Sequence, residues 1–164
     1  LTIPINDLTL LPSPPLLGCI SITYLLLPLT TVSYCDPKQV QVITDLVAKP
    51  VNLHIRLKVA GVGSTKLQIV SSSPKIANLL LLDNNLDVCN IEIRPKGIIV
   101  RFRSLLETFA HVIPFYRLTI FKGKSTTYSI HSEGQKIGIQ ATKSAHSFFS
   151  KITDQKAKYM QNPT

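Results

Sequence analysis

Apolar and polar side chains alternate along short segments in the second half of the chain. This period of two is the pattern of half-buried β-strands, whose successive side chains point to opposite faces. Stretches rich in Gly, Pro, Ser and Lys separate the segments, as expected of turns. The predicted strands are 88–93, 98–103, 108–113, 116–121, 127–131 and 136–140. Short strands at this spacing predict a mainly β protein with an antiparallel sheet or barrel.

The first two of these strands form a predicted hairpin whose register follows from its loop. A four-residue loop over 94–97 places Ile93 opposite Ile98. The next pair on the same face is Ile91 with Val100, so four apolar side chains lie together. The proline in the loop favours this arrangement because its ring forbids the positive φ of a two-residue primed turn. The opposite face carries the charged residues Glu92, Arg101 and Arg103.

Helical periodicity replaces the strand pattern near the end of the chain. From Ser144 onward, apolar residues recur at i, i+3, i+4 and i+7, and the pattern continues through Tyr159 until Pro163. The first apolar positions are Ala145, Phe148, Phe149 and Ile152. We therefore expect a C-terminal amphipathic helix that covers the sheet or closes the barrel with its aromatic face.

The first half of the chain predicts a short helix and a pair of strands. Asp36 can cap a helix, Pro37 suits its first position, and Pro50 ends the pattern. Alternation then predicts a strand over 51–60, followed by a glycine-containing turn and a partner strand at 67–70.

Composition divides the chain into three predicted parts. Residues 8–35 carry no charged side chain and contain four prolines, which sets the segment 1–35 apart. Residues 36–80 hold the short helix and the strand pair, and residues 81–164 hold the run of strands and the C-terminal helix. The cluster of serines and a proline at 71–74 is typical of a linker and marks the second boundary.

Three interpretations compete for the uncharged N-terminal stretch. A transmembrane helix needs about 20 apolar residues, but the apolar run 16–27 ends at Pro28. A lipoprotein-type leader ending at Cys19 lacks a basic start, because Asp7 stands where the positive region belongs. Alternation over 20–24 favours an apolar strand with a proline-rich connection, which is the interpretation we adopt.

Charge narrows the class of partner. The 164 residues carry 18 Lys and Arg against nine Asp and Glu, for a net charge of +9, while 45% of the residues are hydrophobic. A chain of this length and composition can bury one core. The positive charge favours phosphate groups, nucleic acid or an acidic membrane surface as partners.

Catalytic and metal-binding patterns are not predicted. The odd number of cysteines lacks paired spacing, so we interpret them as small buried hydrophobes in a reducing compartment: Cys19, Cys35 and Cys89. The histidines lack metal-ligand spacing: His54, His111, His131 and His146. Gly123, Lys124 and Ser125 lack the earlier glycine and the following helix of a phosphate-binding loop. We therefore predict no catalytic residue, no metal, no cofactor and no small-molecule substrate.

The order of elements and three sequence phrases carry a family resemblance. The phrases are NIEIRPKGIIVRFRS, HVIPFYRLTIFKG and YSIHSEGQKIGIQ, and the strands are followed by one C-terminal amphipathic helix. In these respects residues 88–158 resemble small bacterial proteins with the pleckstrin-homology-like fold. The resemblance implies a seven-stranded barrel, so that one strand comes from 53–70 or the barrel is incomplete. It also implies a non-enzymatic binding or adaptor module.

One candidate anion-binding site lies on the first hairpin. Lys96 is placed near the tip of the turn, and Arg101 and Arg103 share one strand face because they are two residues apart. This arrangement resembles the basic pattern with which some pleckstrin-homology domains bind phosphorylated lipid headgroups. Converging cations make charge-assisted bonds to phosphate, with Arg supplying bidentate geometry. The alternative is a basic strand face that contacts only solvent.

Three functions remain open at this point. The first is a binding module for anionic lipid headgroups, located in the cytoplasm or peripherally at a membrane. The second is a protein-interaction module that takes an extended peptide from a protein partner at a sheet edge or beside the helix. The third is nucleic-acid binding, for which the net charge is the support.

Overall fold

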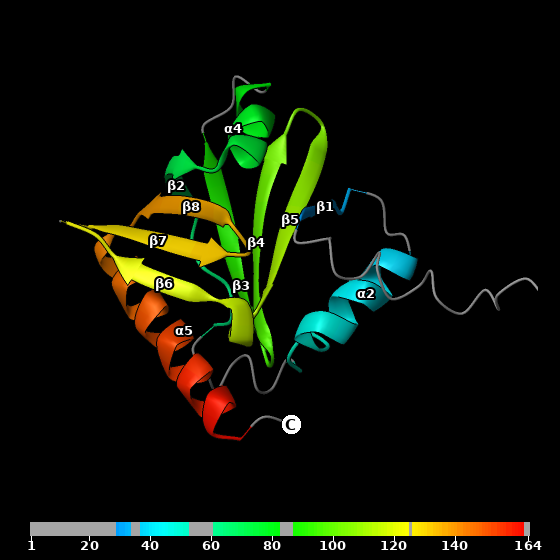
Figure 1. Cartoon of the computed structure of the whole chain (residues 1–164), viewed down its shortest axis with the longest axis vertical. Coiled ribbons are helices and arrows are strands. Elements are labelled where there is room, and N and C mark those ends of the chain that lie inside the picture. Colours follow the sequence, from blue (N-terminus) through cyan, green and yellow to red (C-terminus); the bar gives the residue numbers. More distant parts are fainter. Residues whose placement is uncertain (1–28, 34–36, 53–60, 83–86, 125, 163–164) are drawn as a thin grey trace, which may run out of the picture.

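The computed structural model describes residues 29–33, 37–52, 61–82, 87–124 and 126–162. Within them, eight strands form one antiparallel sheet with helices packed on it (Figure 1). The predicted mainly β class with a C-terminal helix is confirmed, and of the two predicted alternatives the structure has the open sheet rather than the barrel. No helix in the described ranges is long and apolar enough to cross a bilayer.

The strands follow the spatial order β1-β5-β4-β3-β2-β8-β7-β6. Their bounds are β1 Leu29–Thr31, β2 Leu67–Ser72, β3 Val88–Arg94, β4 Gly97–Ser104, β5 Glu107–Pro114, β6 Thr119–Lys122, β7 Thr127–Ser132 and β8 Gln135–Gln140. The helices are α2 Pro37–Val47, α4 Pro74–Leu81 and α5 Lys143–Gln161, and a short 3₁₀ helix, η2, spans Phe115–Arg117.

The register of the β3–β4 hairpin agrees with the sequence prediction. Ile93 pairs with Ile98, and Ile91 pairs with Val100. All four side chains are buried in one core cluster. The apolar pattern and the proline-containing loop therefore set the pairing of these strands.

The strand predicted at 67–70 is confirmed as β2, and its neighbours in the sheet are β3 and β8. Gln68 pairs with Val88 of β3 on one side and with Gln140 of β8 on the other. The predicted partner strand over 51–60 lies mostly outside the described residues, as does the apolar stretch before residue 29. The sheet thus takes a strand from before residue 81, and the three-part domain division stays a prediction.

The predicted linker at 71–74 is occupied by regular structure. Ser71 and Ser72 complete β2, and Pro74 begins α4 at the first helical position, where its missing N–H costs nothing. Ile76 and Leu80 are buried on one side of α4. The serine and proline cluster therefore ends a strand and starts a helix that the sequence pattern did not predict.

The strand predicted over 116–121 is wrong in its first half. Phe115–Arg117 forms η2, and β6 begins only at Thr119. Phe115 is fully buried, and its ring lies 5.7 Å from that of Tyr159 on α5, centroid to centroid. Burial of this ring against the C-terminal helix turns the chain here, which the local alternation could not reveal.

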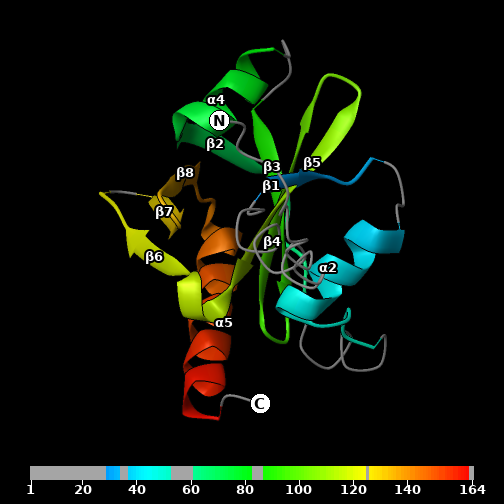
Figure 2. The same ribbon diagram turned by 45° about the vertical axis from the view of Figure 1, so that its right-hand side comes forward.

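Two clusters of buried side chains lie on opposite faces of β4 and β5. The larger one joins both halves of the sheet to α4 and α5 and contains Phe148, Phe149 and Ile152 of α5. The smaller one lies under α2 and consists of Val47, Ile99, Ala110 and Val112. Figures 1 and 2 show α2 and α5 on opposite sides of these strands. The second cluster explains why Ile98, Ile99 and Val100 are all buried in succession.

Gly97 is expected to resist substitution because α2 and β5 approach it closely. A Cβ atom there would lie 2.7 Å from Val47 Cγ1 and 2.8 Å from Pro114 Cα, and it would overlap the carbonyl oxygen of Ile113. Two of these atoms belong to the backbone and cannot rotate away. We expect Gly97→Ala to lower the free energy of unfolding by about 1–3 kcal/mol, measured by urea denaturation.

Gly63→Ala is the matched control for this substitution. A Cβ atom at Gly63 would meet no described atom within 4 Å. Its midpoint of unfolding should stay close to that of the parent protein. Equal loss of stability in both variants would contradict the close approach at Gly97.

Candidate functional site

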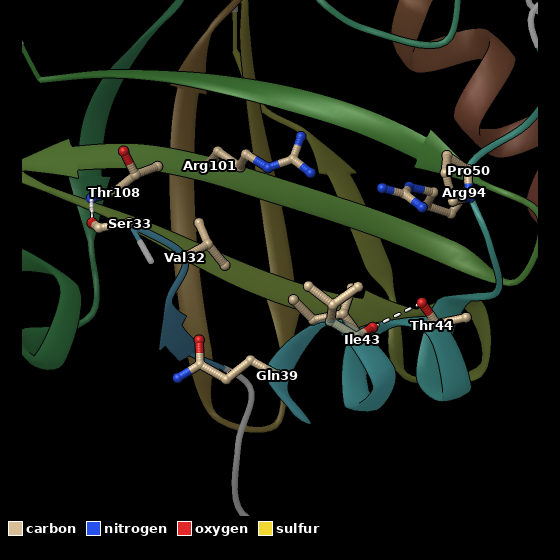
Figure 3. A pocket seen from close by; sticks show the side chains of 10 residues that line it. Val32, Ser33, Gln39, Ile43, Thr44, Pro50, Arg94, Arg101 and Thr108 are labelled. Carbon is tan, nitrogen blue, oxygen red and sulfur yellow. Dashed lines mark hydrogen bonds between the residues drawn. The ribbon is translucent and has the colours of Figure 1, made fainter. Parts of the chain in front are cut away.

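A groove of about 440 Å³ lies between α2 and the exposed face of the β3–β5 strands (Figure 3). It forms because α2 packs only part of this face, through Val47 and Ile43, and leaves the strand positions beside it uncovered. The residues that give the groove its polar lining are Ser33, Gln39, Thr44, Arg94, Arg101 and Thr108. The sheet side of the groove is therefore polar, through Arg94, Arg101 and Thr108, whereas α2 contributes both polar and apolar side chains.

Two arginines on adjacent strands share one carboxylate at this groove. Arg94 Nε lies 2.6 Å from Glu92 Oε1, and Arg101 Nη1 contacts Glu92 Oε2. Figure 3 shows the two guanidinium groups pointing toward one another. The three side chains together carry one net positive charge. Arg101 is 37% exposed and Glu92 is 15% exposed, so Arg101 is the cation with access to solvent.

Arg94 forms the inner end of the cluster. Its side chain is 11% exposed, and its Nη1 donates a hydrogen bond of 3.5 Å to the carbonyl oxygen of Ala48. Ala48 follows α2 with a φ of 66°, a left-handed conformation that often ends helices. The buried Nε of Arg94 makes no hydrogen bond among the described residues, but it lies within ion-pair distance of Glu92. Helix α2 and Glu92 thus fix Arg94 in place.

Of the three residues predicted to bind anions, Arg101 alone lines the groove. Arg103 is exposed on the same strand face, where its Nε donates a hydrogen bond of 3.3 Å to the Leu105 carbonyl oxygen. Lys96 lies in the turn, about 17 Å along β4 from Arg101 at the usual rise per residue. Its backbone N–H donates to the Val47 carbonyl oxygen over 3.3 Å. The three-residue anion site stays a prediction.

Sequence reasoning missed Arg94 as a partner of Arg101. The available signal was the hairpin register, in which Asn90 is opposite Arg101 and Glu92 is therefore its diagonal neighbour. Arg94 shares a face with Glu92 because it is two residues away. The contribution of α2 had no such signal, because its packing on this face is a long-range contact.

Cys89 and His146 make contacts within the described parts of the chain. Cys89 is buried, and burial raises the pKa of its thiol to about 12, so it is protonated at neutral pH. This agrees with the interpretation of Cys89 as a buried hydrophobe, whereas Cys19 and Cys35 lie outside the described residues. His146 Nδ1 and the Tyr128 hydroxyl are 2.8 Å apart in a hydrogen bond. Among the residues that the structure describes, no group of three or more His, Cys, Asp or Glu could hold a metal ion.

Comparison with known proteins gives no family: no family model, no curated protein and no solved structure matches the chain. The pleckstrin-homology-like resemblance of residues 88–158 therefore stays a prediction.

Proposed function

We propose that the protein is a non-enzymatic binding module that recognises a phosphate-bearing group at the groove between α2 and the sheet. The observation that carries the proposal is the convergence of Arg94 and Arg101 on one groove, with a single carboxylate between them. Guanidinium groups bind phosphate through paired, charge-assisted hydrogen bonds. The groove volume of about 440 Å³ falls within the range of small-ligand sites, about 300–1,000 Å³.

Each member of the cluster has a distinct part in this proposal. Glu92 and Ala48 hold Arg94 and reduce the cost of burying its charge. Arg101 contacts the ligand, because it is the more exposed guanidinium. The net charge of +9 attracts anions over long range. At about 0.1 M salt this attraction is screened beyond about 10 Å, so contacts in the groove decide affinity.

Arg101→Gln is expected to weaken binding of inorganic tripolyphosphate by about 10- to 100-fold at about 0.1 M salt. The reason is the loss of charge-assisted hydrogen bonds worth about 1.5–3 kcal/mol. Isothermal titration calorimetry on the full chain measures the change. Lys122→Gln is the matched control, because it removes the same charge from the exposed edge strand β6.

The outcomes of this experiment separate the site from the overall charge. Equal weakening by Arg101→Gln and Lys122→Gln would mean that only net charge matters. A larger effect of Lys96→Gln than of Arg101→Gln would place the anion at the turn of the hairpin instead of the groove. Retained binding in all three variants would reject the proposal.

A second candidate function is capture of an extended peptide at β6. This strand is last in the sheet order and pairs with β7. Thr119, Phe121 and Lys122 are exposed, and the residue Phe121 is 55% exposed. Edge strands of this kind can pair with a partner strand through backbone hydrogen bonds. Nucleic-acid binding has only the net charge in its favour.

A further inference from the structure

Four leucines are exposed together at one end of the molecule, where α4 ends and β4 turns into β5. Their exposed fractions are 80% for Leu81, 62% for Leu82, 54% for Leu105 and 86% for Leu106. Figures 1 and 2 both place the end of α4 and the β4–β5 turn at the top of the molecule. The Ser104 hydroxyl donates a hydrogen bond to the Leu79 carbonyl oxygen, which ties the turn to α4. We refer to these four residues as the leucine tip.

The leucine tip conflicts with the local rules of hairpin formation. Leu105 and Leu106 form the turn between the paired residues Ser104 and Glu107. Leu105 has a φ of 54°, and glycine, asparagine or aspartate is favoured in this conformation. A leucine at this position strains the backbone, and because its side chain is exposed it gains no free energy from burial. Residues that break such rules without a structural gain often mark functional positions, and clustered exposed apolar side chains often mark contact surfaces.

Cations lie directly behind the leucine tip on the strand that leads to it. Arg103 is tied to the turn by its hydrogen bond to the Leu105 carbonyl oxygen. Arg101 lies about 7 Å further along β4, given the strand rise per residue. Glu107 and Asp87 are also exposed at this end, and their carboxylates repel an anionic surface. Attraction to such a surface therefore comes from the two arginines and from the net charge of +9. The leucines supply the apolar part of the contact.

We infer that the leucine tip inserts into the surface of a bilayer that contains anionic lipid. Apolar side chains of peripheral proteins enter a membrane by about 5–10 Å, and anionic headgroups attract basic residues near that surface. Insertion of Leu105 and Leu106 to this depth places Arg103 at the level of the lipid phosphates, with Arg101 next to it. The inference rests on the proposed function, because it identifies the phosphate-bearing group at the groove as a lipid headgroup.

The decisive variant replaces the turn with residues that suit its backbone. Leu105→Gly together with Leu106→Ser favours the positive φ and removes the apolar side chains, so folding is preserved. We expect the affinity for vesicles of phosphatidylcholine and phosphatidylserine, measured by cosedimentation, to fall at least about tenfold. The reason is that burial of one leucine side chain in the membrane raises the affinity by more than about tenfold. Affinity for inorganic tripolyphosphate should stay unchanged. Phe121→Ser, on β6, is the control for an exposed apolar side chain elsewhere.

A tryptophan reporter tests insertion directly. The chain contains no tryptophan, so Leu106→Trp provides a single emission signal. Its emission should shift to shorter wavelength when vesicles with phosphatidylserine are added and should stay constant with vesicles of phosphatidylcholine alone.

Three results would overturn the inference. The first is that the turn variant binds vesicles as well as the parent protein does, and the second is that the tryptophan emission stays constant with anionic vesicles. The third is that the parent protein forms a dimer and the turn variant does not. In the first two cases, retained tripolyphosphate binding that is sensitive to Arg101→Gln would leave the proposed function standing. If the parent protein does not bind tripolyphosphate at all, the proposed function itself is rejected.

Discussion

Phe149→Ala is expected to lower the free energy of unfolding by about 3–5 kcal/mol. Phe149 is 1% exposed, and its ring stacks on that of Tyr128 with centroids 4.1 Å apart and an interplanar angle of 8°. It also meets the ring of Phe148 edge to face at 6.5 Å. Truncation removes these contacts and leaves a cavity between α5 and the sheet. A loss of this size is a large fraction of the stability of a typical domain, about 5–15 kcal/mol.

Urea denaturation followed by circular dichroism measures this loss. Phe121→Ala is the matched control, because the same truncation at a residue that is 55% exposed should change stability by no more than about 0.5 kcal/mol. An unchanged midpoint for Phe149→Ala would mean that the aromatic face of α5 is accessible and available to a partner.

A fragment of residues 81–164 is expected not to fold by itself. It lacks β2, which is hydrogen-bonded to β3 and β8 and joins the two parts of the sheet. It also loses the buried side chains of Leu67, Ile69 and Ile76 from the larger core cluster. Two strand edges would then be unpaired in the middle of the sheet, and the core would be open to water.

Thermal unfolding of this fragment should therefore show no cooperative transition, while a fragment of residues 61–164 keeps β2 and α4 and serves as the control. Limited proteolysis of the full chain gives an independent test. A stable product that begins between residues 71 and 88 would contradict the expectation and would support the predicted domain boundary.

The elements that sequence patterns predicted well are those that local contacts specify. The hairpin of β3 and β4 needs only its own alternation and its loop, and α5 needs only the recurrence of Ala145, Phe148 and Phe149. The helix α2 was also predicted, since a proline start and a proline stop enclose it. In each case the information lies within about twenty residues of sequence.

The features that escaped prediction depend on contacts between distant segments. Phe115 is in a 3₁₀ helix rather than a strand, and Tyr159 of α5 packs on its ring. Helix α4 buries Ile76 and Leu80 in a core cluster that strands later in the sequence also form. The same holds for the groove. Arg101 was predicted from the hairpin, but the place of Arg94 in the groove depends also on α2, because Ala48, just after this helix, accepts its hydrogen bond.

The position of β2 also bears on how the chain reaches its native state. β3, β4 and β5 pair with their neighbours in sequence. In contrast, β2 pairs with β8 (Gln68 with Gln140) and β1 pairs with β5 (Leu29 with His111), so the paired strands are far apart in sequence. Sheets that depend on such remote pairings fold slowly, because closing long loops costs entropy before any contact repays it. During synthesis, β2 leaves the ribosome well before β8 exists. We expect the nascent chain to expose an apolar strand edge for that interval, which makes it a candidate for chaperone binding.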